Sequence, residues 1–219
     1  AAQHRQPGRG PRRGRGDPWH RRLPRRPGLG GRVGSGGPVA SRFAGRRGHG
    51  RGAEPGRAVA TAGAVRLGLL AASILGAKPV KAEIYLHGSF AETYKGHGTD
   101  MALLAGLMGW LPDDERIPQA DSYAEKNGLE YSYHKIDLGN KAHPNTVLFK
   151  LTAENGARCD IVGSSVGGGQ VQVTEIDGFP VELTGRLPAI LTVHIDTRGV
   201  IALVTSTLAN AGVNIATMR

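Results

Sequence analysis

Cysteine is almost absent from this chain, since Cys159 is the only one among 219 residues. A single thiol excludes an intramolecular disulfide framework and any metal site built from cysteines of this chain alone. The sequence also lacks a run of about 18 apolar residues, which excludes an ordinary transmembrane helix. These absences predict a protein of a reducing, cytoplasmic setting that does not enter a membrane.

The first 60 residues lack Lys, Ile, Asn, Tyr and Met, and their only aromatic side chains are Trp19 and Phe43. They hold 15 Arg against one Asp and one Glu, a net charge of +13, together with 15 Gly and 7 Pro. So few large apolar side chains cannot form a core, and we expect a disordered low-complexity arm over 1–60. Residues 61–219 carry a net charge of −3, so the overall +10 describes no folded domain.

The Arg-Gly repeats of this arm are open to three interpretations. Guanidinium groups on a flexible backbone could neutralise nucleic-acid phosphates, although the aromatic side chains that stack on bases are nearly missing. A solvated tail is the second interpretation. We favour the third over the nucleic-acid arm: the residue types are those of G- and C-rich codons, as in GC-rich DNA translated out of frame. We therefore expect no nucleic-acid partner.

From Thr61 onward the hydrophobic pattern is that of a folded protein. Helical spacing, strand alternation and glycine-rich breaks predict an α+β fold. The expected elements are a helix over 61–77, a strand over 80–87 with His87 on its exposed face, a polar loop over 88–98, a helix capped by Thr99 or Asp100, a helix from 118 to 127 and a strand over 129–136.

Two hairpins are predicted next, because Asn-Gly and Asp-Gly are the pairs best suited to the positive φ angles of a tight turn. Asn155-Gly156 joins the strands expected over 146–153 and 158–166. Asp177-Gly178 joins those expected over 170–176 and 179–183. The last predicted elements are a strand over 189–195, a helix over 200–211 and a strand over 213–218.

Three polar segments carry a resemblance to a known family. They are His87-Gly-Ser-Phe-Ala-Glu-Thr-Tyr-Lys-Gly-His-Gly-Thr-Asp100, His143-Pro-Asn-Thr146 and Ser164-Ser-Val-Gly-Gly-Gly169. In this order they resemble the beta chain of the iron-sulfur-dependent L-serine dehydratases. The resemblance covers 61–219 and implies a mixed α/β beta-chain domain over 61–186, followed by the start of a ferredoxin-like ACT module over 189–219.

The chain departs from this family at both ends. Family members place Ser-Ser-Ser-His-Thr-Ala-Gly-Ala before the first helix, and only Thr61-Ala62-Gly63-Ala64 matches that element here. An ACT module needs about twice the residues of 189–219, so we expect an incomplete sheet there. Both ends therefore look truncated or frameshifted, and we expect this fragment alone to be inactive.

The resemblance implies a part in the conversion of L-serine to pyruvate and ammonia, which begins with loss of water. That reaction needs a base for the Cα proton and a Lewis acid for the departing hydroxyl, and in this family a 4Fe-4S cluster is the Lewis acid. Because a cluster normally takes several thiolates, the resemblance implies a separate alpha chain that ligates it. Cys159 is then expected to be a small buried apolar residue.

The resemblance also assigns candidate site residues, none of them a metal ligand. His97 lies between two glycines and before a helix whose N-terminal N–H groups favour a carboxylate, so it is the expected catalytic residue. The expected substrate-binding residues are Thr93, Lys95, Gly98, Thr99 and Asn145. Chemistry alone also allows a loop histidine bonded to its own backbone, a solvated lysine, an Asx turn at Asn145 and a plain helix cap at Asp100.

Asp196 and Gly199 open onto the last predicted helix, where ACT modules bind an amino acid, commonly between two copies. We therefore expect an effector site for serine and a homodimer contact there, with a plain capped turn as the alternative. For the whole chain, the alternative function is a non-catalytic amino-acid-sensing module like that of D-3-phosphoglycerate dehydrogenases. The segment from His87 to Asp100 favours the lyase.

Overall fold

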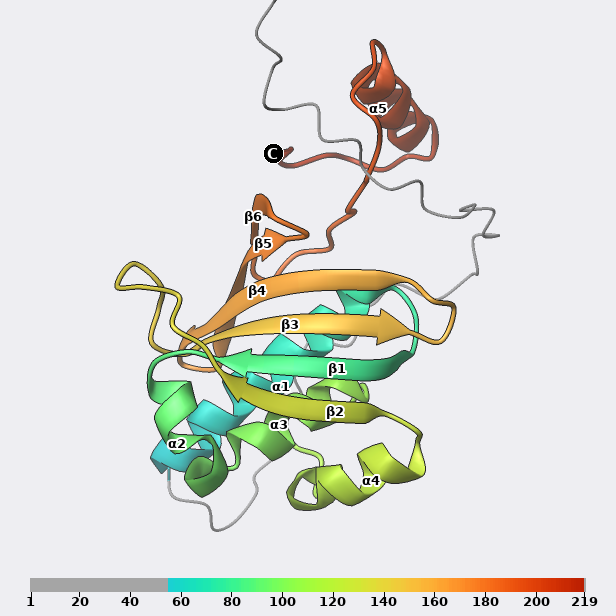
Figure 1. Ribbon diagram of the computed structural model, residues 1–219. Coiled ribbons are helices and arrows are strands. Elements are labelled where there is room, and N and C mark those ends of the chain that lie inside the picture. Colours follow the sequence, from blue (N-terminus) through green and yellow to red (C-terminus); the bar gives the residue numbers. More distant parts are fainter. Residues whose placement is uncertain (1–54, 219) are drawn as a thin grey trace, which may run out of the picture. The chain divides into compact units, whose positions relative to one another are not determined.

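The computed structural model describes residues 55–218, with side chains from residue 61 onward. This part of the chain contains a six-stranded sheet in the order β2-β1-β3-β4-β5-β6, and Figure 1 shows helices α1 and α3 behind it. Strands β1 and β2 are parallel, whereas every other neighbouring pair is antiparallel. The expected α+β class is confirmed, and the arm predicted over 1–60 falls almost wholly outside the described residues.

After α1 and β1 the chain forms three α-helices and a 3₁₀ helix, and then five consecutive strands before the last helix. In chain order they are α1 (Pro55–Leu75), β1 (Pro79–Leu86), α2 (Ser89–His97), α3 (Thr99–Leu107), the 3₁₀ helix η2 (Ile117–Gln119), α4 (Ala120–Lys126), β2 (Glu130–Lys135), β3 (Thr146–Ala153), β4 (Arg158–Gly167), β5 (Gln170–Ile176), β6 (Phe179–Leu183) and α5 (Val200–Asn210).

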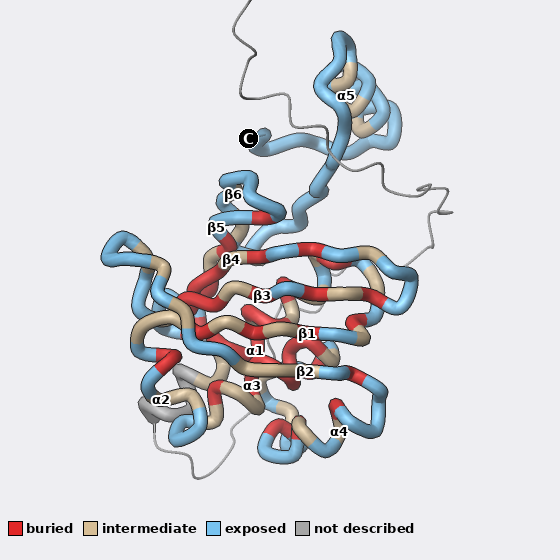
Figure 2. Tube along the Cα trace, viewed as in Figure 1, coloured by how far each residue is buried: buried red, intermediate tan, exposed pale blue. Residues whose placement is uncertain are grey.

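The hydrophobic core lies between one face of the sheet and helices α1 and α3. Helix α1 packs against α3 and against strands β3, β4 and β5. Figure 2 shows buried and exposed positions alternating along the strands. This is expected because successive side chains of a strand point to opposite faces of the sheet, and helices cover one of those faces. In β1, the side chains of Ala82, Ile84 and Leu86 are buried and those between them are not, which confirms the predicted alternation.

Two glycines allow α1 and α3 to cross with their backbones in contact. A Cβ on Gly106 of α3 would overlap the Val65 carbonyl oxygen, and a Cβ on Gly68 of α1 would overlap the Leu103 carbonyl oxygen. Both glycines are buried. The two glycines let the backbones of α1 and α3 approach each other closely. Any larger residue would place a methyl group against backbone atoms, which cannot rotate away from it.

Both predicted hairpins are present. Gly156 has φ +79° in the β3–β4 turn, and Asp177 and Gly178 have φ +50° and +83° in the β5–β6 turn. In the β5–β6 turn both central residues have positive φ, the geometry that fits the right-handed twist of the flanking strands, whereas in the β3–β4 turn Gly156 has positive φ and Asn155 does not. The turn chemistry in the sequence was therefore sufficient to place these four strands.

The stretch over 88–98, predicted as a polar loop, is mostly helical instead. Helix α2 begins at Ser89 and ends at His97, and Gly98, with φ +69°, separates it from α3. The helix forms because Phe90 and Ala91 are buried against the core, and this tertiary contact outweighs a polar, glycine-containing sequence. The first helix also begins earlier than predicted, at Pro55.

The C-terminal segment is only partly as predicted. Helix α5 is present and ends before Gly212, which has φ +72°. The strands expected over 189–195 and 213–218 do not form in the described structure. A strand requires a partner for its N–H and C=O groups, and no neighbouring strand pairs with either segment within residues 55–218.

The helices of residues 55–218 include none with the length and hydrophobicity of a membrane-spanning helix.

Candidate functional site

The first two motif segments meet where β1 ends and β3 begins. The His87 N–H donates to the Thr146 carbonyl at 3.0 Å, and the Phe90 N–H donates to the Pro144 carbonyl at 3.4 Å. Gly88 between them has φ +57°, and a Cβ there would stand 2.6 Å from the Pro144 oxygen. Only glycine accepts both the backbone angle and this close approach.

The third motif segment joins the same place through buried hydroxyl groups. Thr146 and Ser164 face each other across β3 and β4, with 2.7 Å between their hydroxyl oxygens. The Thr146 hydroxyl donates to the His143 carbonyl at 2.6 Å, so its own proton is used and the Ser164 hydroxyl must be the donor between the two. The Ser165 N–H donates to the Asn145 carbonyl at 3.0 Å.

Helix α1 closes this arrangement from the core side. A Cβ on Gly63 would overlap the Ser165 hydroxyl, so the helix backbone lies directly against that buried serine. One turn later, the Arg66 Nη1 donates to the Gly169 carbonyl at 2.6 Å, across 103 residues of sequence. We call the set of Gly63, Arg66, Gly88, 143–146 and 164–169 the motif junction.

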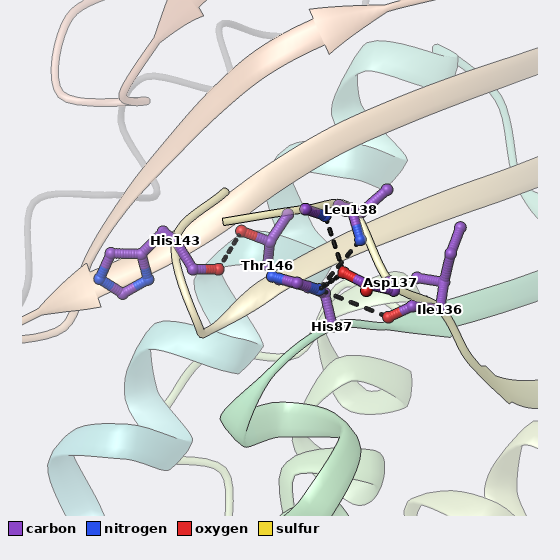
Figure 3. A network of polar contacts seen from close by, with 7 residues as sticks. His87, Ile136, Asp137, Leu138, His143 and Thr146 are labelled. Carbon is purple, nitrogen blue, oxygen red and sulfur yellow. Dashed lines mark hydrogen bonds and ion pairs between the residues drawn. The ribbon is translucent and has the colours of Figure 1, made fainter. Parts of the chain in front are cut away.

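His87 anchors the neighbouring loop and is not solvent-exposed as predicted. Its side chain is 12% exposed, and its Nδ1 accepts the Leu138 N–H at 3.1 Å, as Figure 3 shows. The Ile136 carbonyl and an Asp137 carboxylate oxygen lie farther from Nδ1, at 3.4 and 3.8 Å. Because the amide donates to Nδ1, the neutral ring carries its proton on Nε2. The error arose because β1 ends at Leu86, so strand alternation does not extend to His87.

His97, the expected catalytic residue, is exposed at the last position of α2. Its Nδ1 lies 3.2 Å from the Thr93 carbonyl, which is the backbone bond that chemistry alone suggested. The Thr93 hydroxyl donates to the Ser89 carbonyl at 2.8 Å, and the Lys95 ammonium lies 5.8 Å from the Tyr94 ring centre. None of the contacts described for these side chains reaches the motif junction.

The corner between α2 and α3 contains the other candidates of the first segment. Gly98 donates its N–H to the Tyr94 carbonyl in a left-handed conformation, and Thr99 is buried at the start of α3. Asp100 is not the helix cap that was expected, since Gly98 occupies that position, although its carboxylate accepts the Met101 N–H at 2.9 Å. Burial raises the pKa of the Asp100 carboxyl above its ordinary value of 3.8.

Of the expected substrate-binding residues, Asn145 is the one within the motif junction. Its N–H donates to His143 Nδ1 at 3.1 Å and its carbonyl accepts from Ser165, and no hydrogen bond is described for its carboxamide. The backbone contact with the histidine ring replaces the Asx turn considered from the sequence. The junction residues Gly63 and Arg66 were missed, although Gly63 lies in the matched Thr61–Ala64 element.

The predicted effector residues are at the start of α5. Gly199 has φ +87° and its carbonyl accepts the Leu203 N–H at 2.9 Å, while Asp196 is exposed. This is the geometry of an ordinary helix start. It is compatible with an effector site and equally with the plain capped turn that was the alternative.

Comparison with known proteins identifies the family. The model of the serine dehydratase beta chain family matches residues 60–176, a range that includes all three motif segments. The chain belongs to the serine dehydratase beta chain family. It is 42% identical over 159 residues to a probable L-serine dehydratase beta chain of Bacillus subtilis, which covers 73% of this chain and 71% of the relative.

A second relative gives the same result. The L-serine dehydratase beta chain of Peptoniphilus asaccharolyticus is 40% identical over 159 residues, covering 73% of this chain and 72% of the relative. A D-3-phosphoglycerate dehydrogenase of Synechocystis is 25% identical over 157 residues, covering 71% of this chain and 28% of that protein. The family predicted from the three motif segments is therefore confirmed.

The residues of this family member do not fit a 4Fe-4S cluster. Such clusters are held mainly by cysteine thiolates, and the whole sequence has one cysteine. Cys159 is buried in β4 among core side chains, as expected. Within the described residues, no three or more His, Cys, Asp or Glu side chains are grouped as metal ligands would be.

Proposed function

We propose that this chain is the beta chain of an L-serine ammonia-lyase, which converts L-serine to pyruvate and ammonia. Loss of water from serine gives an enamine, which becomes an imine and is hydrolysed to the two products. The observation that carries the proposal is the motif junction: three segments far apart in sequence meet in a chain about 40% identical to two L-serine dehydratase beta chains.

A separate alpha chain would supply the cluster in this proposal. The support is the donor set of this chain, because one buried thiol cannot replace the several thiolates that a cluster requires. The contribution of the beta chain is then to bind and orient serine and to move protons. The same division of labour explains why this fragment alone is expected to be inactive.

We assign the proton transfer to His97. Its Nδ1 faces a carbonyl oxygen, which can only accept, so Nδ1 carries the hydrogen and the neutral ring has its lone pair on Nε2. That nitrogen is on an exposed side chain and is able to receive a proton. Substrate binding is assigned to the residues around this corner and to the junction, namely Thr93, Lys95, Gly98, Thr99 and Asn145.

The test is to co-express the full chain with an L-serine dehydratase alpha chain under anaerobic conditions and to measure pyruvate formed from L-serine. A second arm restores the family element through the substitutions Arg57→Ser, Ala58→Ser, Val59→Ser and Ala60→His, and we expect higher activity from it. If neither complex forms pyruvate, the lyase proposal is wrong.

In the active complex, His97→Asn is expected to lower kcat by about 10²- to 10⁴-fold, the usual contribution of a general base. Asparagine keeps a donor for the Thr93 carbonyl, so the change removes the basic nitrogen with little effect on the helix end. The matched control is His134→Asn, an exposed histidine of β2 that hydrogen-bonds to Ser132, and it should retain full activity. Equal activity of both variants would disprove the role of His97.

The second candidate function is an amino-acid-sensing module without catalysis. It is favoured by the 25% identity with a D-3-phosphoglycerate dehydrogenase. For either function we propose domains over 61–186 and 189–219, an effector site at Asp196 and Gly199, and a homodimer contact through the second domain. Serine binding without pyruvate formation in the complex would favour the sensing module.

A further inference from the structure

Arg66 is a partly buried cation whose only described hydrogen bond is to a backbone carbonyl. It lies on α1, one turn beyond Ala62 and Gly63, and its Nη1 donates to the Gly169 carbonyl at 2.6 Å. A Cβ on Gly169 would stand 3.0 Å from the same nitrogen, so the glycine turn passes directly over the guanidinium group. The contact fixes the side chain at the motif junction.

The charge of Arg66 has no carboxylate partner among the described residues. The ion pairs within residues 61–218 involve other side chains, and no acidic group of this range lies within ion-pair distance of the guanidinium. A guanidinium has five N–H donors in a planar fork, and within the described residues one hydrogen bond uses them. Partial burial of an unpaired charge is costly, which favours an anionic ligand.

The groups near Arg66 suit a small polar ligand. Residues 167–169 are all glycine, with φ +95°, +60° and +71°, and glycine has no side chain that could cover the guanidinium. The buried Ser165 hydroxyl lies against the same turn of α1, and the Asn145 backbone is bonded to Ser165. A planar two-oxygen anion is the partner that the guanidinium fork binds best.

We propose that Arg66 binds the carboxylate of an α-amino acid at the motif junction, with the Gly169 carbonyl positioning the guanidinium. This inference rests on the proposed function, in which that amino acid is L-serine. The remaining N–H donors form a paired contact with the two carboxylate oxygens. Arg66 is then a substrate-binding residue of the reaction and takes no part in proton transfer.

The test compares L-serine with L-serinamide, in which an amide replaces the carboxylate, using the full chain alone and in complex with the alpha chain. Equilibrium dialysis measures binding, and the complex gives KM for L-serine and the inhibition constant of L-serinamide. We expect Arg66→Gln to weaken L-serine by about 10- to 100-fold, the usual effect of losing a charge-assisted contact. L-serinamide should change by less than about 2-fold.

Two further variants make the result specific. The glutamine of Arg66→Gln keeps a donor for the Gly169 carbonyl. The variant Arg66→Lys keeps the positive charge but lacks the planar fork of donors, so Arg66→Lys should lose less affinity for L-serine than Arg66→Gln. Should Arg66→Gln fail to fold, Arg66→Lys gives the same comparison. The control is Arg158→Gln, an exposed arginine of β4, which should bind both ligands as the unsubstituted chain does.

Each outcome decides the proposal. Unchanged L-serine affinity, or equal loss of L-serine and L-serinamide, in a folded Arg66 variant would overturn it. Selective loss of L-serine in a complex that forms pyruvate would support it together with the lyase function. Selective loss without any pyruvate would support the role of Arg66 and disprove the lyase function. No binding of L-serine by the unsubstituted chain, alone or in complex, would overturn both.

Discussion

The crossing of α1 and α3 yields a prediction in which two opposing effects have known sizes. Replacing a helix-interior glycine by alanine usually stabilises a protein by about 1 kcal/mol, because glycine has the greater freedom in the unfolded chain. In Gly106→Ala, however, the new methyl group meets three backbone atoms, the Val65 oxygen, the Leu69 nitrogen and the Gly68 Cα. Overpacking of this kind costs about 1–3 kcal/mol.

We expect the cost to exceed the gain, because none of the three atoms can move without shifting a helix. The net loss for Gly106→Ala is up to about 2 kcal/mol in the free energy of unfolding, which lowers Tm by up to about 8 °C in a domain of this size. Urea and thermal unfolding followed by circular dichroism measure both quantities.

The matched control is Gly96→Ala in α2. A Cβ at Gly96 has no heavy atom within 4 Å and its φ lies in the ordinary range, so this variant should gain up to about 1 kcal/mol. Opposite signs for the two variants are the expected result. Equal or greater stability of Gly106→Ala relative to the unsubstituted chain would refute the close crossing.

Two other predictions concern polar groups that are buried or partly buried. Thr146→Val should cost about 1–3 kcal/mol of unfolding free energy, because the buried Ser164 hydroxyl loses its acceptor, whereas Thr146→Ser should retain most of the stability. Urea unfolding that ranks the two variants equally would contradict this role of the hydroxyl. Asp100→Asn should raise stability at pH 7, because burial raises the pKa of the Asp100 carboxyl and so penalises its charged form in the folded state. Relative to the variant, the unsubstituted chain loses free energy of unfolding as pH rises above about 3.8, the ordinary pKa of the Asp100 carboxyl, so the advantage of the variant should fade near pH 3. An advantage independent of pH would contradict this reasoning.

Several elements follow from local chemistry, and these are the ones that the sequence predicted well. The Asn155-Gly156 and Asp177-Gly178 turns need positive φ, which these residue types accept at low cost, so both hairpins could be placed without any tertiary information. The alternation in β1 and the glycine after α5 are of the same kind. In each case the deciding interaction lies within a few residues.

The errors share a different cause. Helix α2 is polar and glycine-containing, and it forms because Phe90 and Ala91 are buried by distant elements. The alternation that predicted an exposed His87 fails because β1 ends at Leu86 and the loop over 136–138 covers the imidazole. The segments expected to be strands near the C-terminus have the right composition, but composition cannot provide a hydrogen-bonding partner.

By itself, the sequence determined the motif segments, the turns and, through the motif resemblance, the family. Only the tertiary structure decided which of those residues lie together, because the contacts of the junction join positions up to 103 residues apart. Sheet pairing aligns Thr146 with Ser164, and the packing of α1 brings Gly63 against Ser165 and Arg66 against Gly169. An arginine looks the same in a sequence whether it is solvated or held against a backbone carbonyl, and only its position in the fold distinguishes the two.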